Sequence, residues 1–205
     1  MKKIFIVMLI ASQGAVFGQG KDSPDAGWIS LFDGKSFLGW KPAEHAATFT
    51  ISNGMIVVFG DRAHLFYEGP VANHSFKNFE FKATVMTTPG SNSGIFIHTE
   101  FQPDGWPKKG YEIQVNNTHT DWRKTGSIYA VQDVKEALAK DNEWFTEQII
   151  VQGKKITILI NGKVINEYTE PAEGGRLSGG TFALQGHDPK SKAYYKDVMV
   201  KILPD

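Results

Sequence analysis

The residues best suited to chemistry lie in one short alternating stretch, YEIQVN at residues 111–116. Successive side chains of a β-strand point to opposite faces, so Glu112, Gln114 and Asn116 share one face and the apolar residues between them share the other. The apolar face predicts contact with a core. A carboxylate followed by two amides, without a lysine, is unlike an ordinary solvated strand face. It indicates a surface that hydrogen-bonds a ligand and contains a group able to accept a proton.

Other strand-like stretches contain polar residues of the same kind. The stretch GIFIH (94–98) places Phe96 and His98 on one face, and TFALQGH (181–187) does the same for Gln185 and His187. The stretch SIYAV (127–131) presents Tyr129 in the same way. If these faces coincide, a curved sheet collects one concave patch of Glu112, Gln114, His98, Gln185, His187 and Tyr129. Such a patch suits a polyhydroxylated ligand, and its Glu and His side chains can transfer protons near neutral pH.

Loop residues around this patch extend the predicted binding set. Asn92 lies just before Gly94, where the absence of a side chain lets the backbone approach a ligand closely. Trp106 and Trp122 lie in the loops FQPDGWPKKG (101–110) and THTDWRKTG (118–126), on either side of the 111–116 strand. An indole ring packs well on the apolar face of a sugar. An ordinary turn and ordinary loop packing explain these residues equally well.

Several chemistries do not fit the sequence. A glycosidase needs two carboxylates across the scissile bond, whereas Glu112 is followed by Gln114 and Asn116. Gly-x-Ser-x-Gly, phosphate-loop and dinucleotide motifs are absent from the sequence. Two imidazoles and a carboxylate, from His98, His187 and Glu112, are a conceivable metal set, but no spacing requires it. We therefore predict neither a metal nor a cofactor.

Charge and cysteine content narrow the partners. The chain has 22 basic and 22 acidic residues and no cysteine. Zero net charge argues against nucleic acid, which binds to a positive field. Without cysteine there is no disulfide and no thiolate nucleophile. The sequence contains no signal for an oligomeric state.

The N-terminus predicts export. MKK is a basic start, and the apolar run IFIVMLIASQGAVFG ends in small residues, as signal peptides do. We predict a signal peptide at residues 1–18, a small polar linker at 19–27 and a single domain at 28–205, in the periplasm or secreted. After cleavage we expect no membrane association. An uncleaved membrane anchor is the alternative.

The remaining chain is rich in strand signals. Asn53-Gly54 and Asn161-Gly162 each join two apolar runs, as tight hairpin turns do. The stretch NFEFKATVM (78–86) alternates regularly, which predicts its Phe, Ala and Val residues in a core. Only Asp133 to Asp141 has helical character, enough for one or two turns within a loop. Many strands with almost no helix predict an all-β antiparallel sandwich or barrel.

A series of segments in this order resembles the 3-keto-disaccharide hydrolase family. They are LFDGKSFLGW (31–40), FTISNGMIVV (49–58), FKNFEFKATV (76–85), GSNSGIFIH (90–98), KGYEIQV (109–115), TGSIYAV (125–131), VQGKKITILINGKVINEY (151–168) and GTFALQGHD (180–188). The resemblance runs from about Gly27 to the C-terminus. It implies a concanavalin-like jelly-roll β-sandwich of two antiparallel sheets with a concave binding face. It also implies activity on sugars oxidised to a ketone at C3, as an exported bacterial protein.

That chemistry matches a site with one central carboxylate. A C3 ketone acidifies the C2 hydrogen, so a base can remove it and the C1 substituent can leave by β-elimination, with water adding back. We predict Glu112 as the base or as the group that orients a histidine base, with His98 and His187 as enolate donors or acids. The predicted substrate-binding residues are Gln114, Gln185, Asn92, Tyr129, Trp106 and Trp122.

Two other functions are compatible with this sequence. A non-catalytic carbohydrate-binding module would use the same patch, with Glu112 only accepting hydrogen bonds from hydroxyls. A laminarinase-like glycoside hydrolase is disfavoured by the missing second carboxylate. In all three cases the ligand is a small carbohydrate.

Overall fold

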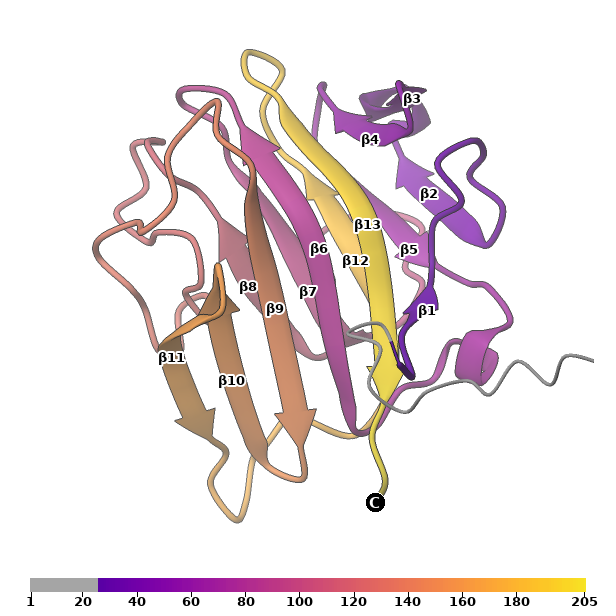
Figure 1. Cartoon of the computed structure of the whole chain (residues 1–205), viewed down its shortest axis with the longest axis vertical. Helices are drawn as coiled ribbons and strands as arrows, with labels where there is room; N and C mark the ends of the chain where they lie inside the picture. Colours follow the sequence, from indigo (N-terminus) through magenta and orange to yellow (C-terminus); the bar gives the residue numbers. More distant parts are fainter. Residues whose placement is uncertain (1–25) are drawn as a thin grey trace, which may run out of the picture.

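The computed structural model describes residues 26–205. Two antiparallel sheets pack face to face, with the alternating apolar residues of their strands between them (Figure 1). The larger sheet has the order β11-β10-β9-β6-β13-β4-β3, with β1 paired to β13. The smaller sheet has the order β2-β5-β12-β7-β8. The fold is the predicted all-β, concanavalin-like jelly-roll sandwich.

The strands are two to ten residues long. The larger sheet consists of β1 (Ile29–Ser30), β3 (Phe49–Ser52), β4 (Met55–Val58), β6 (Phe79–Thr87), β9 (Phe145–Gln152), β10 (Lys155–Ile160), β11 (Lys163–Thr169) and β13 (Ala193–Ile202). The smaller sheet consists of β2 (Trp40–Glu44), β5 (Ala63–Tyr67), β7 (Ser93–Thr99), β8 (Tyr111–Val115) and β12 (Thr181–Gly186). Two 3-10 turns, η1 (Ala46–Thr48) and η2 (Val71–His74), are the only helical elements among the described residues. No helix in residues 26–205 is long and apolar enough to cross a membrane.

The core lies between the sheets, where the alternation places it. The predicted inward residues of β6 are all fully buried, and the apolar residues of β8 pack in the same cluster. Both Asn-Gly hairpins are confirmed. Asn53 and Gly54 have φ of 51° and 77° between the paired residues Ser52 and Met55. The second hairpin joins β10 to β11 in the same way, with φ of 51° and 75° at its Asn and Gly.

Two predictions about local structure are wrong. SIYAV is not a strand, because Ile128 bridges Gln132 across a tight turn in which Ala130 has a φ of 57°. Residues 133–141 form turns and bends rather than a helix. Local propensity predicts these two segments poorly, because contacts with the rest of the fold override it. The predicted signal peptide and most of the linker lie outside the described residues, so export and the domain boundaries stay predictions.

One core position contradicts the apolar pattern. On β9, Glu147 occupies an inward place among Phe145, Ile149 and Val151, and its side chain is fully buried. Neither carboxyl oxygen has a hydrogen-bond partner in the described part of the chain. Burial raises the pKa of Glu147 well above its usual range. The folded protein therefore favours the neutral acid at this position.

A hydrogen-bond chain crosses the core close to this carboxyl group. The fully buried Tyr195 of β13 has its hydroxyl 2.6 Å from Ser93 Oγ on β7. Ser93 Oγ in turn donates to the backbone carbonyl of Gln185 on β12, at 2.5 Å. Since a carbonyl only accepts, the Tyr195 hydroxyl is the donor to Ser93. The chain links the larger sheet to the strand that holds Gln185.

Candidate active site

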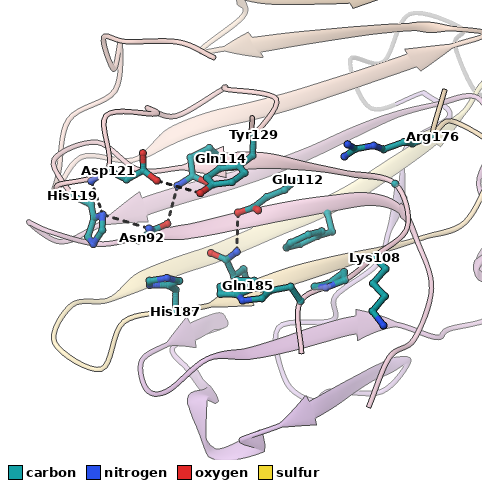
Figure 2. A pocket seen from close by; sticks show the side chains of 14 residues that line it. Asn92, Lys108, Glu112, Gln114, His119, Asp121, Tyr129, Arg176, Gln185 and His187 are labelled. Carbon is teal, nitrogen blue, oxygen red and sulfur yellow. Dashed lines mark hydrogen bonds between the residues drawn. The ribbon is translucent and has the colours of Figure 1, made fainter. Parts of the chain in front are cut away.

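A cavity of about 500 Å³ opens on the face of the smaller sheet that points away from the core (Figure 2). Strand β8 places Glu112 and Gln114 on this face, because the residues that alternate with them pack inward. Strand β12 contributes Gln185, and His187 follows at the strand end. The predicted residues Asn92, Tyr129 and Trp106 line the same cavity. Seven of the nine predicted site residues therefore meet in one place, although their roles stay predictions.

Glu112 lies at the centre of the cavity and is partly buried. Gln185 Nε2 donates a hydrogen bond to Glu112 Oε1 at 2.8 Å (Figure 2). Burial raises the pKa of Glu112 to about 7, the Gln185 hydrogen bond opposes this rise, and the charge of Asp121 adds to it. Among residues 26–205, Glu112 forms no ion pair with a cationic side chain. Near neutral pH it is thus balanced between its acid and its base forms, as a general base requires.

Gly94 is needed for the position of Glu112. It lies on β7, paired with Gln114 and two places from the pair Phe96 and Glu112. A Cβ atom at residue 94 would lie 2.7 Å from Glu112 Oε1 and 3.0 Å from its Cγ. The sequence predicted that the missing side chain admits a ligand. In the structure the space above Gly94 is filled by the carboxylate of Glu112 itself.

Two amide oxygens beside the cavity have no hydrogen-bond partner among residues 26–205. The side chains of Gln114 and Gln185 are almost completely buried, and each leaves its Oε1 atom without a hydrogen bond. Their amide nitrogens are engaged, Gln114 Nε2 with Asn92 Oδ1 at 2.8 Å and Gln185 Nε2 with Glu112. A buried acceptor without a partner costs free energy unless a ligand or water supplies a donor. Sugar hydroxyls are donors of this kind.

His119 completes a chain of hydrogen bonds that starts at Gln114. Asn92 Nδ2 lies 3.4 Å from His119 Nδ1, and the backbone N–H of Asp121 donates to the same nitrogen at 3.0 Å. Since Nδ1 accepts, the proton of the neutral ring is on Nε2. His119 therefore offers a donor to the cavity that it lines. Our sequence reasoning did not identify this residue.

Asn116, the third polar residue of the starting stretch, shapes this loop rather than the cavity. It is fully buried. Its Nδ2 donates to the carbonyls of Asp121 at 2.9 Å and Arg123 at 2.8 Å, and its Oδ1 accepts from the N–H of His119 at 2.8 Å. This amide thus helps to fix the path of the loop that presents His119 and Asp121, together with Lys124, whose Nζ donates to the carbonyls of both residues.

A second carboxylate lines the cavity, contrary to the prediction of a single acid. Asp121 Oδ1 accepts from the backbone N–H of Arg123 at 3.0 Å and faces its guanidinium at 3.4 Å. Its Oδ2 lies 3.5 Å from the hydroxyl of Tyr129. Asp121 is therefore an ion-paired carboxylate held by its own loop, whereas Glu112 has only an amide beside it. The sequence could not place residue 121 opposite residue 112, because a loop connects them.

His187 and Trp106 form the opposite wall of the cavity. Their ring centroids lie 5.6 Å apart at an interplanar angle of 36°. Burial lowers the pKa of His187, and the nearby ring of His119 lowers it further. The two imidazole centroids are 6.1 Å apart. His187 is therefore neutral near pH 7, so it donates hydrogen bonds without a net charge.

His98 is not in the cavity, which corrects the expectation that it shares a face with Phe96. The pairing of β7 with β12 shifts between Thr181 and Ala183, and His98 has a φ of 52°. This β-bulge ends the simple alternation. The ring turns toward the core, 5.5 Å from the ring of Phe79, and Nε2 donates to the carbonyl of Lys77 at 3.0 Å.

Trp122 also lies outside the group of cavity residues. It is 50% exposed and stacks on the guanidinium of Arg123, whose Cζ is 4.9 Å from the ring centroid. The conceivable metal set of His98, His187 and Glu112 does not come together. Within residues 26–205, no group of three His, Asp or Glu side chains is arranged to hold a metal ion.

The fold and this cavity define a concanavalin-like β-sandwich protein with a polar ligand site on one sheet. The chain belongs to the family of 3-keto-alpha-glucoside-1,2-lyase-like domains, whose model matches residues 27–201. This confirms the resemblance seen in the sequence.

Three known proteins illustrate the relationship. A 3-keto-disaccharide hydrolase of Bacteroides thetaiotaomicron is 26% identical over 69% of this chain and 58% of that protein, so the match spans little more than half of the relative. A crystal structure from Parabacteroides distasonis, provisionally named a glycosyl hydrolase, has a TM-score of 0.73 and 23% identity over 87% of this chain and 95% of that one. The carbohydrate-binding module CBM66 of Bacillus subtilis has a TM-score of 0.61 and 12% identity over 80% and 96% of the two chains. The two structures share the fold.

Proposed function

We propose that this protein cleaves the glycosidic bond of 3-keto-glycosides, including 3-keto-disaccharides, by removing the C2 proton and eliminating the C1 substituent. The observation that supports this best is Glu112. It is a cavity carboxylate with a pKa of about 7, held by a neutral amide and without a cationic partner. The family and the hydrolase from Bacteroides thetaiotaomicron support the same substrate class.

The proposed reaction needs one base and several neutral donors. Glu112 takes the C2 hydrogen as a proton, and the electron pair moves onto the C3 oxygen as an enolate. The enolate then re-forms the ketone while the C1–O bond breaks, and the leaving group departs as an alcohol after gaining a proton. Water adds to C1 and a proton returns to C2, which gives net hydrolysis. His119 and His187 line the cavity as neutral donors that can stabilise the enolate oxygen or protonate the leaving group.

The unpartnered amide oxygens support a sugar as the ligand. Gln114 Oε1 and Gln185 Oε1 are buried acceptors that lack donors among the residues that the structure describes. Both oxygens are closed off from solvent in the structure, so the two side chains must turn before the hydroxyls of a pyranose ring can donate to them. A carbohydrate-binding module would use the same oxygens, so this observation supports binding in either function. Asp121 likewise gives a conventional glycosidase a second acid, although Arg123 already pairs with it.

A substrate comparison tests the proposed function. We expect turnover of a 3-keto-glucoside and none of the same glucoside unoxidised, because without the ketone the C2 hydrogen is not acidic. In heavy water, deuterium should appear at C2 of the keto product. Comparable cleavage of the plain glucoside would instead establish a conventional glycosidase. Binding of both sugars without turnover would establish a binding module.

We predict that Gly94→Ala lowers kcat on the keto substrate by about tenfold to a hundredfold, because displacing a catalytic group by about 1 Å has effects of this size. Gly94 does not need a left-handed backbone, so the new methyl group disturbs mainly the carboxylate of Glu112. Thermal unfolding should change little. Gly153→Ala is the control, since it strains a turn with φ of 59° and open space around it. It should lower stability and keep kcat. Full activity of Gly94→Ala would show that the position of Glu112 does not matter.

A further inference from the structure

One end of the cavity is positively charged. Lys108 and Arg176 line it on the far side of Glu112 from His119 and Asp121 (Figure 2). Neither cationic side chain forms an ion pair or a hydrogen bond with another residue of the described part of the chain. The whole protein has equal numbers of basic and acidic residues. The charge at this end is therefore a local arrangement and does not reflect a basic protein.

Arg176 is held at the cavity through its backbone. Glu170 is buried, and its Oε1 accepts from the N–H of Arg176, from the N–H of Leu177 at 2.8 Å and from the hydroxyl of Tyr111 at 2.5 Å. These contacts occupy the carboxylate with backbone and tyrosine donors. The Arg176 guanidinium instead lies over the ring of Tyr111, with Cζ 5.3 Å from its centroid. Its charge is thus placed at the cavity without an acidic side chain to pair with it.

Two consecutive lysines separate into different environments on the other loop. Lys109 lies 3.4 Å from Glu100 and is not among the residues that line the cavity. Lys108 lines the cavity, directly after Trp106 and Pro107. The loop ends at Gly110, with a φ of 80°, where a Cβ would lie 1.9 Å from the carbonyl oxygen of Ile97. This tight turn requires glycine, and it fixes where the two lysines lie relative to the start of β8.

We propose that Lys108 and Arg176 form a subsite for an anionic group, such as a carboxylate, sulfate or phosphate, on the leaving group of the glycoside. The proposal rests on the proposed function, because it places the sugar ring at Glu112. The amides and imidazoles at the other end suit ring hydroxyls. Phe96, Trp106 and Pro107 also line the cavity, and their apolar surfaces suit the apolar part of a leaving group. A guanidinium and an ammonium are the side chains that bind carboxylates and phosphates.

The test uses two substrates of nearly equal shape, the 3-keto-glucosides of 4-hydroxybenzoate and of 4-hydroxybenzamide, of which only the first is charged; the benzamide is the slightly better leaving group, so leaving-group acidity works against the expected preference. We expect kcat/KM to be about tenfold higher for the carboxylate at low ionic strength, and this ratio to fall as salt screens the two cations. Lys108→Met and Arg176→Met should each lower the ratio, and the double variant should bring it close to one. Lys109→Met removes the same charge from the neighbouring position and should leave the ratio unchanged. An equal fall of the ratio in Lys109→Met would overturn the subsite in favour of general attraction.

Binding of the unoxidised glucosides separates this proposal from the proposed function. Calorimetry with the benzoate and benzamide glucosides should give the same preference for the carboxylate, since no chemical step is involved. Turnover of both keto substrates with equal kcat/KM, and equal Kd values for the two glucosides, would overturn the subsite and leave the reaction intact. Selective binding of the benzoate without turnover of either keto substrate would overturn the reaction and leave the subsite intact.

Discussion

Replacing Glu112 by Gln is expected to lower kcat on a 3-keto-glucoside by about a hundredfold to ten-thousandfold, the usual contribution of a general base. The substitution keeps the size of the side chain and its contact with Gln185, but it removes the group that takes the C2 proton. The loss should therefore fall on kcat more than on substrate binding. Full activity of Glu112→Gln would leave elimination intact and transfer the role of base to His187.

The pH dependence gives this prediction a second readout. Because Glu112 must be ionised to act as a base, kcat/KM of the wild type should rise with pH up to about 7, the pKa of this carboxyl, and then level off. Gln185→Leu removes the hydrogen bond that favours the ionised form, so its rise should lie at higher pH. If kcat/KM of Gln185→Leu rose over the same pH range as that of the wild type, the rise could not be assigned to the ionisation of Glu112.

Glu147→Gln is expected to increase the free energy of unfolding at pH 7 by about 1 to 3 kcal/mol, because it removes a buried acid that ionises easily only in the unfolded chain. The folded pKa of Glu147 lies above the unfolded one, so its carboxyl favours folding below about pH 4.3. That contribution is lost as the pH rises toward the folded pKa. The gain from Glu147→Gln should therefore grow between pH 4 and 7.

The experiment compares the two proteins by thermal and denaturant unfolding across this pH range. At this size, each 1 kcal/mol corresponds to roughly 2 to 4 °C in Tm. Glu167→Gln is the matched control, because Glu167 is exposed and its pKa is lowered by the nearby Lys155, 2.5 Å away. It should give little or no gain. A stability difference between Glu147→Gln and wild type that is the same at pH 4 and pH 7 would contradict a buried ionisable group as the cause.

The parts of the site that lie on regular strands could be predicted from sequence. A period of two placed Glu112 and Gln114 opposite the core, and the same rule brought Gln185 with them. His98 failed because a β-bulge interrupts that period, and a φ of 52° at a histidine leaves no signal in the sequence. Phe96, two residues earlier, stays on the predicted face. Regular alternation therefore predicts a face only as far as the ladder itself stays regular.

Residues presented by loops were harder to predict for a different reason. His119 and Asp121 reach the cavity because Asn116 bonds three backbone groups of their loop. No periodicity encodes such a contact. The available signal was Asn116 itself, an amide on the polar face just before a loop that had already been singled out for Trp122. Arg176 gave no signal, since its position depends on a contact of its backbone with Glu170, six residues earlier in an irregular segment.

The hydrogen bonds from Tyr195 through Ser93 to the backbone of Gln185 mean that a change in the core can alter the properties of the site. Gln185 holds the carboxylate of Glu112, and its own backbone is held by a hydroxyl that faces the opposite sheet. A substitution in the core of β13 would then alter the acidity of a cavity residue without touching the cavity wall. Homologues could in this way shift their working pH while keeping every residue that contacts the sugar. Substitutions that adapt such proteins to an acidic or alkaline habitat would then lie in the core between the sheets. A sequence comparison restricted to cavity residues would miss them.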